Sequence, residues 1–184
     1  PEGRPILVPG VEPSLQGTKM CPSTSGATNW MSPAYNPDTG LFYLAALEGC
    51  GINTKSFEKF RPGGFPFDAT GYTQSPEEPR QLYVRALDLT TGKLGWEFKQ
   101  IGSRAYGAGL LSTAGGLIFA GSDQGIFTAL DARTGQPLWH FNMGQAISAS
   151  PISYSFKGEQ YVAVEAGSNV VAFGLFADSR PERK

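Results

Sequence analysis

The stretch ALDLTTGKLGW at residues 86–96 recurs further along the chain as ALDARTGQPLW at residues 129–139. Both copies fit one template: Ala, any residue, Asp, two free positions, Thr, Gly, three free positions and Trp. The distance between their first residues lies within the ~40–45 residues that separate blades in β-propellers. This repeat therefore predicts a radial array of small antiparallel sheets, although it leaves the chemistry of the protein open.

The composition favours the same architecture. The chain of 184 residues has 24 Gly and 14 Pro but only 17% charged residues, as expected for many short strands joined by turns. Its net charge of −1 gives no electrostatic reason to bind nucleic acid or an anionic membrane. No apolar run approaches the roughly 20 residues of a membrane-spanning helix. Because the sequence opens on Pro1, we expect either a removed leader or a piece of something longer.

Runs of apolar and β-branched residues bounded by Gly, Asn, Asp or Pro can be assembled into repeated four-strand units. We predict an all-β fold, a partial β-propeller of about three to four four-stranded antiparallel blades, with the last copy lacking its fourth strand. The expected segments are blades at about 25–101, 102–144 and 145–176, an insertion at 50–80 within the first, and a tail at 177–184. The insertion contains Pro, Gly and four Phe, and we expect it to be a long loop that is either functional or packed against a neighbour.

Each residue type in the repeated template has a physical use. Asp88 can accept hydrogen bonds from turn amides, Gly92 supplies a positive φ, and Trp96 offers a broad apolar face to wedge between sheets. We therefore predict that the two copies dock neighbouring blades and take no part in ligand binding. The second copy supplies the matching residues Asp131, Gly135 and Trp139.

The two cysteines, Cys21 and Cys50, flank one strand-like segment. They form either a disulfide that ties the ends of a long hairpin, or two unrelated buried thiols. A disulfide would indicate an oxidising compartment.

The template resembles the tryptophan-docking motif of pyrroloquinoline quinone (PQQ) dehydrogenases, the eight-bladed quinoprotein alcohol dehydrogenases. The segments GATNWMSPAYNPDTGLFYLAAL (26–47) and LLSTAGGLIFAGSDQGIFTALDARTGQPLWHF (110–141) are similar to strand pairs of that family. The likeness covers most of residues 25–175. It implies that this chain is the C-terminal portion of such a propeller: a processed fragment, a subunit completed by another chain, or part of a larger protein.

The resemblance also implies what lies elsewhere. In that family the calcium-binding acids and the catalytic aspartate belong to earlier blades, so no catalytic or metal-binding residue is assigned here. An unclosed propeller leaves an open sheet edge, for which we expect the remaining blades or another protein chain as partner. A cytochrome c or a membrane quinone would accept the electrons.

Five residues match positions near the cofactor in the family. Asn29 and Trp30 match an Asn-Trp pair whose amide reaches the quinone, although Asn29 could instead satisfy only local backbone. Tyr106 stands before Gly107 where the family often has Trp, and Ala149 stands where it carries a small residue. These departures point to a divergent branch in which the pocket could be empty.

The resemblance implies a periplasmic, exported oxidoreductase that uses PQQ and Ca²⁺ to oxidise an alcohol or aldose. The alternative is a non-enzymatic propeller that serves as a scaffold or accessory subunit of a larger membrane or electron-transfer complex. The sequence alone does not decide between an active enzyme and this alternative.

Overall fold

The computed structural model describes residues 3–4, 6–56, 62–63, 70–102 and 107–175. Within these ranges the chain forms strands, turns and loops but no helix, and none of it could span a membrane as a helix. The strands are β1 (Thr18–Met20), β2 (Ala34–Asn36), β3 (Leu41–Glu48), β4 (Gly51–Lys55), β5 (Thr70–Gln74), β6 (Gln81–Asp88), β7 (Leu94–Gln100), β8 (Leu110–Ser112), β9 (Leu117–Gly121), β10 (Ile126–Asp131), β11 (Pro137–Asn142), β12 (Ile152–Phe156), β13 (Glu159–Ala166) and β14 (Asn169–Gly174).

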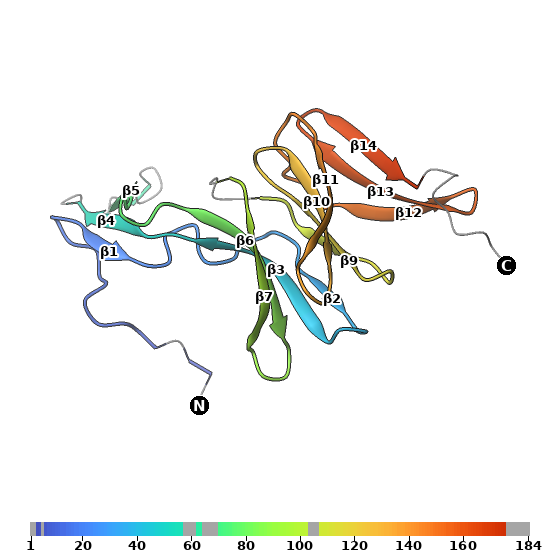
Figure 1. The fold of residues 1–184 in the computed structure, drawn as a ribbon. Helices are drawn as coiled ribbons and strands as arrows, with labels where there is room; N and C mark the ends of the chain where they lie inside the picture. Colours follow the sequence, from blue (N-terminus) through green and yellow to red (C-terminus); the bar gives the residue numbers. More distant parts are fainter. Residues whose placement is uncertain (1–2, 5, 57–61, 64–69, 103–106, 176–184) are drawn as a thin grey trace.

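Three of the four sheets are successive copies of one unit. Blade one has the strand order β2-β3-β6-β7, blade two has β8-β9-β10-β11, and blade three has β12-β13-β14. Neighbouring strands within each blade are antiparallel, and the blades follow one another along the molecule (Figure 1). The predicted all-β fold is confirmed, and blade three lacks a fourth strand among the described residues.

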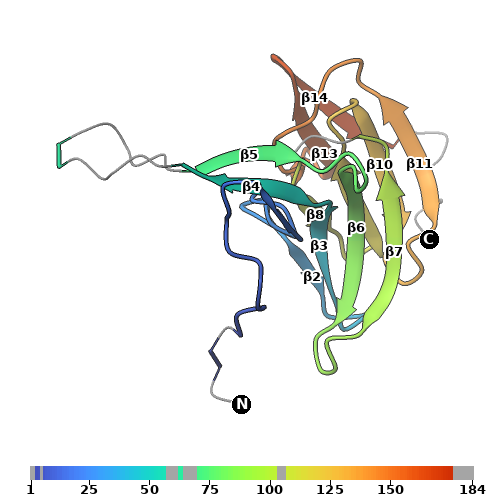
Figure 2. The same ribbon diagram turned by 90° about the vertical axis from the view of Figure 1, so that its left-hand side faces the viewer.

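The fourth sheet is built from the insertion, and it corrects one expectation. The segment predicted to be a loop contains β4 and β5, which pair with each other and with β1 in the order β1-β4-β5. These strands are rich in Thr, Gly and Asn and lack the apolar alternation that reveals a half-buried strand, so the sequence pattern missed them. This accessory sheet extends to one side of the blades (Figure 2). The four Phe of the insertion lie outside the described residues.

Blades one and two share a closely packed apolar interface. Trp96 of β7 is only 8% exposed, and its indole Nε1 donates a hydrogen bond of 3.0 Å to the Ala132 carbonyl of blade two. The Tyr43 hydroxyl donates to the same carbonyl oxygen at 2.9 Å. Gly135 lies beneath the indole, because a β-carbon there would be 2.5 Å from Trp96 Cε3. The remaining buried members of this cluster are Val84, Ala86, Leu110, Ile118, Ala120 and Leu130.

Blades two and three meet in a second cluster, centred on Phe127 of β10. The Phe127 ring lies 5.5 Å from that of Phe173 in β14 and 6.2 Å from that of Trp139 in β11. Trp139 occupies the same place in the repeat as Trp96, yet it is 40% exposed. The buried partners from blade three and its approach are Ile147, Val162, Val164 and Ala166.

The turn that follows β6 is organised by Asp88. One carboxylate oxygen accepts hydrogen bonds from the backbone amides and the hydroxyls of both Thr90 and Thr91, at 2.6–3.0 Å. These bonds, led by the Thr90 hydroxyl, lower the pKa of Asp88 to about 2 because they favour the ionised carboxylate. Gly92 completes the turn with a φ of 67° and donates to the Asp88 carbonyl. Asp131 forms the same kind of turn with Thr134 and Gly135.

Candidate cofactor-facing site

The first strands of the three blades begin close together. The Leu110 amide donates a hydrogen bond of 2.9 Å to the Ser32 carbonyl, which links the start of β8 to the approach to β2. A β-carbon on Gly109 would overlap with the Ser150 side chain and lie 2.9 Å from the Ser32 nitrogen. Glycine is therefore required at position 109 by the close approach of all three blades. The sequence-predicted site residues that the structure describes lie three to five positions before the starts of these strands.

Asn29 and Trp30 lie at the end of the loop that leads into β2. The Asn29 amide nitrogen donates to the Ser25 carbonyl at 3.1 Å, and its Oδ1 accepts from the Trp30 backbone amide at 2.9 Å. The Trp30 side chain is 59% exposed. The Asn29 side chain thus makes local backbone contacts, which are the role expected of it as the alternative to cofactor binding. Because a side-chain amide carries two N–H groups, these contacts leave one donor for a ligand oxygen.

The other three predicted residues are placed less completely. Gly107 is buried, yet a β-carbon there would meet no atom within 4 Å, so its backbone borders open space. Ala149 is half-buried and precedes Ser150, which touches Gly109. Tyr106 lies outside the described residues. The structure therefore brings the segments of Asn29, Gly107 and Ala149 to the neighbouring starts of β2, β8 and β12.

These residues fit one edge of a site for a planar quinone. The spare donor of Asn29 suits a carbonyl oxygen, and the exposed indole of Trp30 offers a flat surface for stacking. Within the described ranges no group of three or more His, Cys, Asp or Glu side chains could hold a metal ion. The residues that would hold Ca²⁺ are therefore not assigned within these ranges.

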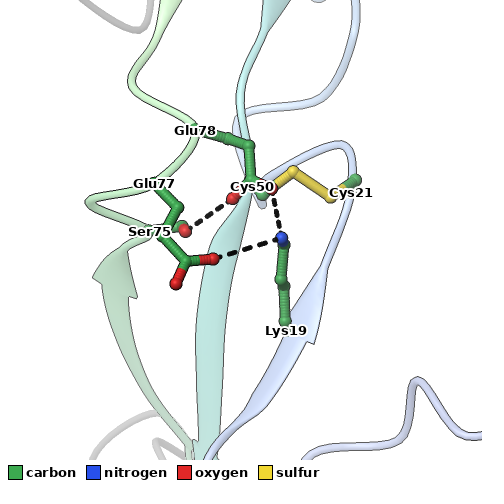
Figure 3. Close-up of a disulfide and its surroundings, with 6 residues drawn as sticks. All are labelled: Lys19, Cys21, Cys50, Ser75, Glu77 and Glu78. Carbon is green, nitrogen blue, oxygen red and sulfur yellow. Dashed lines mark hydrogen bonds and ion pairs between the residues drawn. A yellow bond between two sulfur atoms is a disulfide. The ribbon is translucent and has the colours of Figure 1, made fainter.

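The loop that carries Asn29 begins at a disulfide. Cys21 and Cys50 are bonded, with their Cα atoms 4.5 Å apart, so the disulfide alternative is confirmed and that of two separate thiols is wrong. Figure 3 shows the bond beside a polar cluster in which Lys19 pairs with Glu77 and Glu78, and Glu78 accepts a 2.8 Å hydrogen bond from Ser75. The Lys19 contact lowers the pKa of Glu78 below its usual range.

Gly109, Ser32 and Ser150 were not singled out by the sequence analysis. Their signal is a Ser-Pro pair directly before β2 and again before β12, at Ser32-Pro33 and Ser150-Pro151. Pro favours an extended residue before it, which suits a strand entry. In blade two the corresponding stretch contains Gly109, and only three-dimensional proximity reveals why a side chain is absent there.

Comparison with known proteins gives a consistent family. Residues 100–162 match the β-propeller domain of glucose, ethanol and alcohol dehydrogenases that is named for PQQ. The chain is 36% identical over 175 residues to the quinoprotein alcohol dehydrogenase PedH of Pseudomonas putida, covering 90% of this chain and 29% of that protein. It is 34% identical over 182 residues to a quinoprotein ethanol dehydrogenase of Pseudomonas aeruginosa, covering 90% and 27%.

Solved structures agree with these matches. A europium-containing methanol dehydrogenase superposes with a TM-score of 0.75 at 29% identity, over 88% of this chain and 29% of that one. The quinohemoprotein alcohol dehydrogenase of Comamonas testosteroni gives 0.73 at 27% identity, over 84% and 24%. The chain thus spans less than a third of the length of each of these four relatives.

Proposed function

We propose that this chain, which is homologous to the quinoprotein alcohol dehydrogenases, supplies blades of a periplasmic PQQ-dependent dehydrogenase that oxidises an alcohol or aldose. The proposal is carried by the Asn29–Trp30 pair, which lies in the loop leading into β2, shortly before Ser32, and Ser32 is where the first strands approach one another around Gly109. This is the position at which a ligand on the propeller axis would meet donors from this chain.

The residues of this chain would hold and orient the cofactor. Asn29 would donate its remaining N–H to a quinone oxygen, and Trp30 would stack against the ring. When bound, PQQ supplies an electrophilic carbonyl that accepts hydride from the alcohol, and Ca²⁺ polarises that carbonyl. Gly107 and Gly109 would keep the first strand of blade two close to the axis without a side chain in the way.

Further propeller blades are the partner we propose for blade three. Ile152, Tyr154 and Phe156 on β12 are 40–59% exposed, and Val170 on β14 is 76% exposed. The corresponding face of blade one is covered by blade two. The repeat therefore suggests that a neighbouring blade covers this exposed face of blade three. A cytochrome c or a membrane quinone would receive the electrons from the complete enzyme.

The proposal is tested on the intact protein by titration with PQQ in the presence of Ca²⁺, monitored by the visible spectrum and by dye-linked alcohol oxidation. We expect a saturable quinone spectrum, and Asn29→Ala should weaken PQQ binding about tenfold or more, as loss of a buried hydrogen bond does. Asn169→Ala, at an exposed position of β14, is the matched control and should leave binding unchanged. A folded protein without quinone binding would instead support the scaffold role.

A further inference from the structure

The segment from Cys21 to Met31 is fastened along its length to the end of β3 and the start of β4. The first connection is the disulfide to Cys50. The second is the Ser23 amide, which donates to the Gly49 carbonyl at 2.9 Å, and the third is the Ala27 carbonyl, which accepts from the Leu47 amide at 2.8 Å. The partners in these three connections lie within four consecutive positions of the chain: Leu47, Gly49 and Cys50.

The partner stretch is itself well fixed. Leu47 is 1% exposed and Cys50 is 7% exposed, and Leu47 pairs with Leu82 of β6 in the centre of blade one. A segment fastened to this stretch therefore takes its position from the blade. Without the covalent connection, the contacts described between Cys21–Ala27 and this stretch are two backbone hydrogen bonds, one at Ser23 and one at Ala27.

Asn29 and Trp30 stand between the last of these connections and the next buried residue. Ala27 is two residues before Asn29, and Met31, which is 3% exposed, follows Trp30 directly. Both hydrogen bonds of the Asn29 side chain stay within the segment, to Ser25 and to Trp30. The Asn29 side chain therefore takes its position from the segment that carries it.

We propose that the Cys21–Cys50 disulfide positions the Asn29–Trp30 pair for the ligand on the propeller axis, by holding the Cys21–Met31 segment against the end of β3. This inference rests on the proposed function for the identity of the ligand. It makes Cys21 and Cys50 positioning residues, because neither reaches the ligand. The accessory sheet has connections besides the disulfide, since β1 and β4 pair through their backbones and Lys19 pairs with Glu77 and Glu78.

The test compares the intact protein with its Cys21→Ala/Cys50→Ala variant, using hydrogen exchange measured by mass spectrometry and PQQ affinity measured by fluorescence titration. In the variant we expect peptides covering 21–31 and 44–50 to exchange about tenfold faster or more, because their connections open locally. Peptides covering β9 and β10 should exchange as before. PQQ affinity should fall about tenfold or more, because the donor is no longer held in place.

Two further samples keep the result decisive. Lys19→Met removes the ion pairs on the same sheet but keeps the disulfide, so it should change neither the exchange of residues 21–31 nor the affinity. If the double variant fails to fold, reduction of the native protein with a phosphine gives the same comparison without a substitution. Unchanged exchange at residues 21–31, or unchanged affinity despite faster exchange, would overturn the inference. If the oxidised protein binds no PQQ, the proposed function fails, and the exchange data alone then decide whether the disulfide holds the segment.

Discussion

Trp96 and Trp139 hold the same place in two copies of one motif, yet they lie in different surroundings. Trp96 is 8% exposed, and its indole N–H bonds to the Ala132 carbonyl. Trp139 is 40% exposed and stacks beside Phe141, with Phe127 and Phe173 at its edge. The difference arises from the neighbouring blade, because the turn with Ala132 and Gly135 covers Trp96, whereas Trp139 meets blade three at the Phe173 ring of β14.

The burial of each tryptophan therefore depends on the neighbouring blade and not on the motif that carries the tryptophan. The motif offers an indole to the next blade and a turn to the previous one, so each interface needs two copies. Blade two supplies both halves of this arrangement: it receives Trp96 and presents Trp139. The stability contributed by each copy therefore depends on what stands next to it.

The largest effect is expected for Trp96→Ala compared with Trp139→Ala in this chain. Removing the buried indole should lower the free energy of unfolding by about 3–5 kcal/mol, whereas removing the half-exposed one should cost about 1–2 kcal/mol. Urea denaturation of the two variants measures the difference. Equal costs would show that the difference in exposure between the two indoles does not decide how much each contributes to stability.

A second pair of variants separates backbone strain from interface contact. Gly92 and Gly135 have nearly the same φ, 67° and 72°, but a β-carbon on Gly92 meets nothing within 4 Å, whereas one on Gly135 lies 2.5 Å from the Trp96 ring. Gly92→Ala should cost about 1–2 kcal/mol from strain alone. Gly135→Ala should cost about 1–3 kcal/mol more, because the indole must also move. Similar melting temperatures for the two would refute the role of Gly135 in receiving Trp96.

A smaller effect is expected from the second donor to the Ala132 carbonyl. Tyr43→Phe removes the 2.9 Å hydrogen bond from the hydroxyl but keeps the ring, which lies 5.6 Å from Trp96. Because Trp96 still donates to the same oxygen, the loss should be only about 0.5–1.5 kcal/mol. Tyr35→Phe, at an exposed position of β2, should leave the unfolding midpoint unchanged and is the control.

Much of this fold could be predicted from the sequence, because the repeat determines where strands begin and end. The strands of all three blades fall where the apolar runs and turn residues placed them, from Leu41–Glu48 to Asn169–Gly174. The accessory sheet could not be predicted, since strands such as Gly51–Lys55 bury little apolar surface and gain their order from pairing with distant β1 and β5. A turn of the same kind at Asn36–Gly40 was also missed, because Asn replaces Asp there. The Asn36 amide also donates a hydrogen bond to the Thr113 carbonyl of blade two.

The candidate site was predictable only in part. The resemblance identified Asn29 and Trp30, and the structure places them in the loop that leads into β2, shortly before Ser32. The contact of Gly109 with Ser32 and Ser150 joins residues more than 40 positions apart, and no local pattern reveals such a contact. The alternatives for Cys21 and Cys50 stayed open for the same reason, since spacing does not determine whether two thiols meet.

The smallest expected difference between the two copies of the motif lies in the pKa values of their turn carboxylates, Asp88 and Asp131. Asp88 accepts hydrogen bonds from two threonine hydroxyls, whereas Asp131 accepts from one, because Arg133 stands where Thr90 stands in the first copy. Both bonded carboxylates have a lowered pKa, to about 2 for Asp88, so their contribution to stability is present above the ordinary Asp pKa and is lost as the pH falls through the lowered value.

Carboxyl chemical shifts followed by NMR from acid to neutral pH should show Asp88 titrating below Asp131. Thr90→Ala should raise the pKa of Asp88 and close most of this gap, because the Thr90 hydroxyl is the largest cause of its shift. If Asp88 titrates at the same pH with and without that hydroxyl, the turn amides alone hold the carboxylate ionised, and the two copies of the turn are electrostatically equivalent.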